Sequence, residues 1–290
     1  KNINYLDLFT KKIKNNDNIK KTFKYTFPLI VGSSSGTICN LVDRIFASFL
    51  PEGRITALKY SQTILTMIST ILISSFISST YTEISEIVAK KDFEKLNFRL
   101  KKTANDLMNL VIPLTFWTIL MAEFFIRFLF QRGEFDANST QLVSTALIAY
   151  AAIILITPIS GLISSTLISM KKTIYITYLA ILTIGMNAFF NWILLKPFGH
   201  AGIAASTSLV SIINTIILYI WINKKFKIHF LNLKKIFLQI FLYTFLSFLL
   251  YNLKSINYFV FLIFGNIIFL ALILYTNKNI IVRVLKIFFK

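Results

Sequence analysis

The feature that most constrains this chain is a set of eight long apolar segments separated by connections that are alternately rich and poor in basic residues. The segments cover residues 25–50, 61–87, 104–130, 140–169, 173–195, 200–222, 235–253 and 257–276. Each has about the 20 residues that a helix needs to cross ~30 Å of hydrocarbon. The sequence therefore predicts an all-α, polytopic membrane helix bundle with eight transmembrane helices.

The basic residues are divided unequally between the two sides of this predicted bundle. Of the 31 lysines and arginines, 24 lie in the N-terminal stretch, every second connection and the C-terminal tail, and six lie in the other connections. Basic loops of membrane proteins stay on the cytoplasmic side. We therefore expect a multi-pass protein of the bacterial inner membrane with both termini in the cytoplasm. The one remaining base, Arg44, lies inside the first apolar segment.

Composition excludes several classes of function. The net charge of +19 is high enough for a nucleic-acid-binding protein, but 56% of the residues are hydrophobic, so nucleic acid is not an expected partner. A single cysteine and two histidines leave no disulfide framework and no Cys/His metal cluster. No metalloprotease motif, phosphate-binding loop or clustered acidic pair is found, so we expect no enzyme. The chain begins with lysine, which suggests a fragment or a processed product.

Polar residues inside the apolar segments are the candidate functional residues, because charges in a bilayer are costly unless they are paired or hydrated. Asp43 and Arg44 are adjacent, so their side chains point ~100° apart on a helix, and one of them must face a partner helix or a cavity. Asn187 and Asn191 lie one helical turn apart on the fifth segment. They could supply oxygen ligands to a hard cation, or they could make hydrogen bonds between helices.

The second segment carries hydroxyl side chains at helical spacing. Thr63 comes first, and Thr66, Thr70, Ser74 and Ser78 then recur every four residues, close to one stripe of a helix. Two interpretations stay open. The hydroxyls could bond across tightly packed helices, or they could line a water-filled cavity.

Two charged regions are expected at the membrane surface. The connection between the second and third segments, residues 90–102, mixes lysines with Phe and Leu, which suggests a short helix lying on the cytoplasmic headgroups. Near the outer end of the third segment, Glu123 and Arg127 are four residues apart in the order that favours an ion pair.

Four strings of this sequence, taken together and in order, resemble the MurJ/MviN family, whose members are lipid II flippases of the multidrug/oligosaccharidyl-lipid/polysaccharide exporter superfamily. The most specific of their residues form a block between two segments, namely Phe130, Arg132, Gly133 and Phe135. The strings are NLVDRIFASFL (40–50), PEGRITALKY (51–60), LFQRGEFDANSTQLVSTALIAY (129–150) and KPFGHAGIAASTSLVSIINTIILY (196–219).

The resemblance implies the second lobe of a two-lobe transporter with two extra C-terminal helices. Residues 1–24 would be a cytoplasmic basic leader, 25–222 a six-helix transporter lobe, and 223–290 two additional transmembrane helices with a basic tail. The counterpart of the first lobe would lie upstream or in a separate partner chain. The implied function is translocation of a polyprenyl-pyrophosphate-linked cell-wall precursor such as lipid II by alternating access. The two last segments, rich in Phe, Leu and Ile, would hold the polyprenyl tail.

The resemblance also implies two sites. A sodium ion would be held by Asp43, Asn187, Asn191, the backbone carbonyl of Ile203, and Thr207; no other cofactor is implied. The glycan–pyrophosphate head would enter a cationic cavity, whose wall in this chain we expect to include Arg44, Thr63, Thr70 and Ser74.

Two departures from the family pattern keep alternatives open. Thr63 stands where the family usually has a cavity arginine, and the stretch from Lys171 to Ile174 is a reduced form of a family motif. A site for pyrophosphate needs positive charge. The alternatives are a flippase for another lipid-linked polysaccharide unit, or a non-transporting half-transporter that acts as a membrane scaffold.

Overall fold

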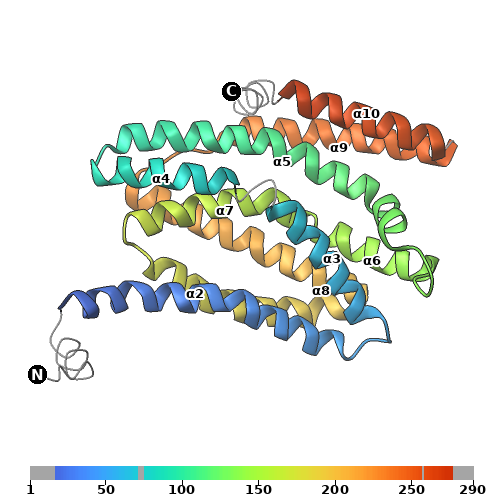
Figure 1. Ribbon diagram of the computed structural model, residues 1–290, viewed down its shortest axis with the longest axis horizontal. Coiled ribbons are helices and arrows are strands. Elements are labelled where there is room, and N and C mark those ends of the chain that lie inside the picture. Colours follow the sequence, from blue (N-terminus) through green and yellow to red (C-terminus); the bar gives the residue numbers. More distant parts are fainter. Residues whose placement is uncertain (1–16, 71–74, 257, 277–290) are drawn as a thin grey trace, which may run out of the picture.

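The structure is a computed structural model that describes residues 17–70, 75–256 and 258–276, and within these ranges it contains helices and no strands. Most of the helices run roughly antiparallel to their neighbours along one common direction (Figure 1). In chain order they are α2 (Asp17–Ala47), α3 (Arg54–Ser69), α4 (Ser75–Ala89), α5 (Phe93–Phe130), α6 (Ala137–Tyr150), α7 (Ala152–Ser169), α8 (Ile174–Phe226), α9 (Leu233–Ile256) and α10 (Tyr258–Thr276).

The eight apolar segments predicted from the sequence all fall on these helices, although helices and segments do not match one to one. The second segment is divided between α3 and α4, and the fourth between α6 and α7. By length and composition alone, four helical stretches of the described residues could cross a membrane: Phe93–Phe130, Ala137–Ser169, Ile174–Phe226 and Leu233–Asn252.

Helix α8 supplies two of the predicted segments. At 53 residues it is far longer than one crossing needs, and its backbone leaves the helical region at Gly199, with φ 56° and ψ −133°. This positive φ is accessible to glycine without steric cost. The two halves fold back on each other, because the Tyr175 and Trp221 rings lie 4.7 Å apart and Ser206 Oγ donates to the Asn187 carbonyl at 3.3 Å.

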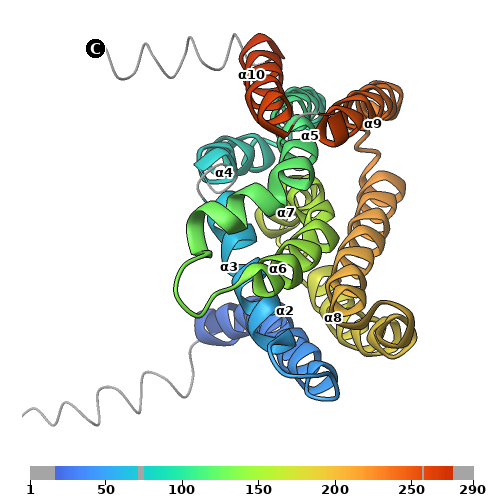
Figure 2. The same ribbon diagram turned by 90° about the vertical axis from the view of Figure 1, so that its right-hand side faces the viewer.

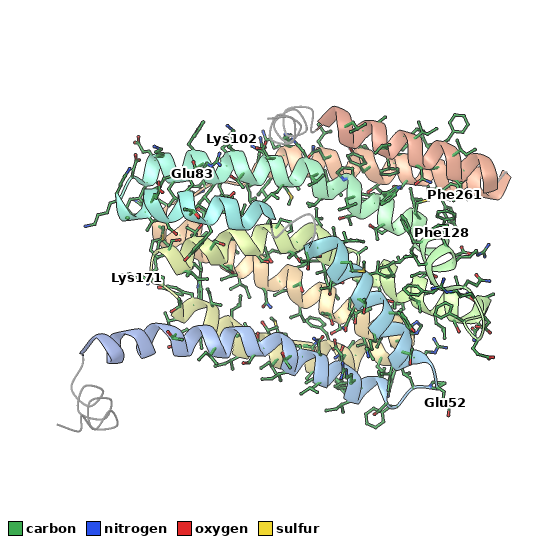
Figure 3. All side chains as sticks on the ribbon, viewed as in Figure 1. Glu52, Glu83, Lys102, Phe128, Lys171 and Phe261 are labelled. Carbon is green, nitrogen blue, oxygen red and sulfur yellow. The ribbon has the colours of Figure 1, made fainter. Side chains whose placement is uncertain are left out.

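Successive connections lie at opposite ends of the bundle. Glu83 and Lys171 lie near one end, and Glu52 and Phe128 lie near the other (Figure 3). The end that carries Lys171 is therefore the one at which the basic connections gather. The expected ion pair at the opposite end is confirmed, since Arg127 Nη2 lies 3.1 Å from Glu123 Oε1.

The expectation of a separate surface helix in residues 90–102 is wrong. Helix α5 begins at Phe93 and continues without interruption into the membrane segment, with the Asp92 carboxylate accepting a hydrogen bond from the Lys95 backbone N–H at 2.9 Å. Leu96 and Leu100 are fully buried. The leucines lie one turn apart and face the core, while Glu94, Lys95 and Lys101 are exposed. The connection is thus the first turns of α5.

Helix α5 lies between the two parts of the bundle. It contacts α4, α6 and α7 on one side and α9 and α10 on the other. Figure 2 shows α9 and α10 beside α5, and α2 on the opposite side of the molecule. Trp117 Nε1 donates to Asn266 Oδ1 at 3.0 Å, and Gln239 Nε2 donates to Asn109 Oδ1 at 2.9 Å. These bonds fasten each of the last two helices to α5.

The outer surface of α9 and α10 is apolar. Its exposed side chains include Phe237, Phe241, Phe245, Phe248 and Phe264. Water would penalise an apolar surface of this extent, whereas the hydrocarbon of a bilayer would not.

Candidate functional site

The candidate site is centred on Asp43, in the C-terminal half of α2. The Asp43 side chain is buried, with 2% of the residue exposed, whereas its neighbour Arg44 is exposed. This is the division that the helical spacing requires, since adjacent side chains point in different directions. Asp43 faces α8, which packs along α2.

Three side chains from the two halves of α8 donate hydrogen bonds to the Asp43 carboxylate. Asn191 Nδ2 lies 2.7 Å and Asn187 Nδ2 lies 3.1 Å from Asp43 Oδ1. Thr207 Oγ1 lies 3.0 Å from Asp43 Oδ2. The break at Gly199 makes this arrangement possible, because it folds Thr207 back beside the two asparagines.

The other oxygens of this cluster lie close by. Thr207 Oγ1 is 3.2 Å from the Ile203 carbonyl oxygen, and Asn187 Oδ1 is 3.3 Å from Asn191 Nδ2. Asn191 Oδ1 is buried and has no hydrogen-bond partner. Buried polar atoms are almost always paired. Asn191 Oδ1 is an exception and keeps a free acceptor position. The five residues expected to hold a cation therefore come together in the structure.

The donor set fits a monovalent cation. Within the described residues, neither salt bridge involves Asp43, and its carboxylate is held by three side-chain hydrogen bonds. The cluster offers one carboxylate, two amide oxygens, a hydroxyl and a backbone carbonyl. Divalent ions generally recruit more carboxylates than this. Both amides present their nitrogens to Asp43 in the structure, so each would have to rotate to turn its oxygen toward an ion.

The predicted cavity residues lie on a different face from the Asp43 cluster. Thr63 of α3 and Thr70, at the C-terminal cap of that helix, are exposed, as is Arg44. Ser74 lies outside the described residues. The Thr63 hydroxyl donates to the Lys59 carbonyl of its own helix at 2.9 Å, so it makes no bond across helices through that hydrogen. Arg44 and Lys59 border one small pocket of about 20 Å³, which also touches Asp43.

Sequence reasoning missed Gln62, which joins the two faces. Its Nε2 donates to the buried Tyr150 hydroxyl at 2.9 Å and lies 3.4 Å from Asn40 Oδ1. The Tyr150 hydroxyl in turn interacts with Thr207 of the Asp43 cluster. A glutamine followed by a hydroxyl series gave no sign of this contact, because Tyr150 is distant in sequence.

A second missed contact joins three helices near the end of the bundle that carries Glu52. His200 Nδ1 lies 2.7 Å from Arg54 Nη1, and His200 Nε2 lies 2.8 Å from the Leu142 carbonyl oxygen. Arginine can only donate, so Nδ1 must accept and Nε2 must carry the proton. The buried ring therefore connects the start of α3, α6 and the turn of α8.

Comparison with known proteins gives one consistent result. The family model described as "Lipid II flippase MurJ" matches residues 5–272. A probable lipid II flippase MurJ of Bdellovibrio bacteriovorus is 25% identical over 204 residues, which are 69% of this chain and 38% of the relative. One of Rickettsia prowazekii is 25% identical over 222 residues, 74% of this chain and 42% of the relative. The chain thus spans about two fifths of the length of these curated relatives.

Solved structures show the same fold. A structure of lipid II flippase MurJ in an inward closed conformation superposes with a TM-score of 0.74 at 24% identity, covering 94% of this chain and 57% of that one. A MOP superfamily transporter from Pyrococcus furiosus superposes with a TM-score of 0.62 at 18% identity, covering 86% of this chain and 56% of that one. The helical arrangement described above is therefore that of half of such a transporter.

Proposed function

Because this chain belongs to the MurJ family of lipid II flippases, we propose that it is the C-terminal lobe of a two-lobe flippase. It would translocate a polyprenyl-pyrophosphate-linked cell-wall precursor such as lipid II by alternating access. The observation that carries the proposal is the family match over residues 5–272, combined with a chain that spans about two fifths of its relatives. A first lobe, upstream or in a separate chain, completes the transporter. The protein acts as a transporter and not as an enzyme.

The head of the lipid would meet the exposed face formed by α2 and α3. Arg44 lies there with Lys59 beside the same small pocket, and the exposed Thr63 and Thr70 continue the face. Two cations without a salt-bridge partner, among the residues that the structure describes, favour an anionic group such as pyrophosphate. Ser74, which lies outside the described residues, stays a predicted residue of the cavity wall. The threonine at position 63 favours a second candidate, a flippase for another lipid-linked polysaccharide unit.

The polyprenyl tail would lie against α9 and α10. Both helices carry exposed phenylalanines and lie on the side of α5 away from α2 (Figure 2). An apolar tail gains nothing from leaving hydrocarbon for such a surface, so its contribution would be to guide the lipid and not to bind it tightly.

The Asp43 cluster would hold the driving ion, which we propose to be sodium. The support is the convergence of Asp43, Asn187, Asn191, the Ile203 carbonyl and Thr207, with one negative charge and one unused amide oxygen. An ion held there would tie α2 to both halves of α8. It would favour one of the two access states, as any ligand with different affinities for two states does.

The chain is a multi-pass inner-membrane protein, and we propose that both of its termini are cytoplasmic. Support comes from the 24 basic residues of the termini and of alternate connections, against six in the other connections.

Complementation tests the proposed function. The full-length gene that encodes this chain should restore growth to a bacterium depleted of its own lipid II flippase, and the same gene with Asp43→Asn should not. Membrane expression of both proteins is the control, because a buried carboxylate can also serve stability. Well-expressed wild-type protein that fails to restore growth would favour the other-glycan flippase or the membrane scaffold.

A further inference from the structure

A second, larger pocket lies between α2, α7 and the two halves of α8. Its volume is about 210 Å³. A cavity of this size has room for roughly seven waters, at about 30 Å³ each. Its wall includes six hydroxyl side chains, together with the amide of Asn214. They are Ser35, Thr157, Ser160, Thr183, Ser211 and Thr215.

The polar side chains of this wall offer mainly hydrogen-bond acceptors to the pocket. Each of the six hydroxyl hydrogens is already donated to a backbone carbonyl three or four residues earlier on the same helix. A hydroxyl that has donated its hydrogen keeps two acceptor lone pairs. The Asn214 Nδ2 group donates to Thr183 Oγ1 at 2.6 Å, and Asn214 Oδ1 is buried with no partner. The pocket therefore presents acceptor oxygens, which suit water and cations.

On both halves of α8, residues that line the pocket lie one helical turn from residues of the Asp43 cluster. Thr183 lies one turn before Asn187, and Ser211 lies one turn after Thr207, whose carbonyl accepts the Ser211 hydroxyl at 2.8 Å. Four residues of helix rise by about 6 Å. Both steps, like the step from Asp43 back to Ser35, lead away from the end that carries Glu52 and toward the end that carries Lys171.

We infer that this pocket is a water-filled vestibule through which a hydrated monovalent cation passes between the cytoplasmic side and Asp43. The inference rests on the proposed sodium site. The vestibule keeps the ion in contact with oxygen acceptors between the cytoplasmic side and the Asp43 cluster. Asn214 lines the pocket and its amide oxygen has no protein partner, and Ser160 of α7 lines the same pocket.

Thiol labelling tests the hydration of the vestibule. In full-length protein with Cys39→Ala, Asn214→Cys should react with a cationic methanethiosulfonate in inside-out vesicles and not in right-side-out vesicles. The anionic sulfonate reagent should react about tenfold more slowly, because a cleft of one polarity concentrates ions of the opposite charge. Ile216→Cys is the matched control, since that exposed side chain faces the lipid. Labelling of Asn214→Cys no faster than of Ile216→Cys would overturn the vestibule.

Sodium-binding kinetics test the connection to Asp43. Ser160→Leu should narrow the pocket with a bulky apolar side chain and slow both binding and release of sodium at least ~10-fold, while leaving the equilibrium affinity unchanged, as an obstructed route requires. Ser160→Ala should behave as wild type. The readout is the sodium-induced fluorescence change of Trp192, next to Asn191. Wild-type rates in Ser160→Leu would refute the route. If sodium produces no stabilisation of the wild-type protein, the sodium site itself fails, whatever the labelling shows.

Discussion

Replacing Thr207 by valine should weaken the Asp43 cluster without changing its volume. Valine has nearly the shape of threonine but has no hydroxyl, so the substitution removes a donor and little else. In the structure Thr207 Oγ1 lies 3.0 Å from Asp43 Oδ2 and 3.2 Å from the Ile203 carbonyl oxygen. The single hydroxyl hydrogen of Thr207 is shared between these two acceptor oxygens, and the Asp43 oxygen is the closer of the two.

The size of the effect follows from that contact. A hydrogen bond to a charged group contributes about 1.5–3 kcal/mol to stability. The equilibrium constant for unfolding of Thr207→Val should therefore be roughly tenfold to a hundredfold larger than that of the wild type, at 1.4 kcal/mol for each factor of ten. The same substitution removes one of the five proposed ion ligands, so the stabilisation by sodium should fall as well.

Thermal unfolding of the full-length protein in detergent, in sodium and in potassium, measures both effects. Thr207→Ser is the matched control, because it keeps the hydroxyl and loses one methyl group. We expect Thr207→Ser to keep the difference between the two salts and Thr207→Val to lose it. A Thr207→Val protein with wild-type stability and a wild-type response to sodium would refute the assigned role of this hydroxyl.

Three further outcomes are expected. Cysteine at Glu52 should react with an impermeant thiol reagent in intact cells and cysteine at Lys172 should not, because basic connections stay cytoplasmic; labelling at Lys172 would reverse the orientation. Arg44→Ala should reduce lipid transport more than Arg127→Ala, because the latter arginine is paired at the surface with an acid one turn away; equal transport at equal expression would remove Arg44 from the site. His200→Phe should lower the melting temperature, because it leaves a buried carbonyl and a guanidinium without their partner; an unchanged melting temperature would contradict the tautomer assigned here.

The succession of long apolar segments and polar connections was enough to predict most of the fold. Each apolar segment can be recognised without knowledge of its neighbours, because it needs only enough length to cross the bilayer. All eight segments fall on helices of the described residues. The break within α8 was predicted between 195 and 200, and it lies at Gly199. The error at residues 90–102 has a physical cause. Lysines suggested a surface element, while the burial of Leu96 and Leu100 depends on neighbouring helices that local sequence does not specify.

The candidate site shows the same limit. Adjacent Asp43 and Arg44 predicted that one of them would face a partner helix or a cavity. The family resemblance supplied the rest of the cluster, which the structure brings together. The Arg54–His200 contact joins residues 146 positions apart, and the Gln62–Tyr150 contact joins residues 88 apart. Neither pairing has a local sequence pattern. The acceptor-lined pocket was also invisible, because its serines and threonines are ordinary residues of packed membrane helices.

The most direct test of this account measures lipid II itself at the outer face of the membrane. In cells depleted of their own flippase, the full-length gene should restore the fraction of lipid II that an impermeant reagent reaches from outside. Asp43→Asn, at equal membrane expression, should reduce that fraction at least ~10-fold, which corresponds to about 1.4 kcal/mol in the transport step. Full transport by Asp43→Asn, or no transport by well-expressed wild-type protein, would contradict a lipid II flippase whose lobe is governed by the Asp43 cluster.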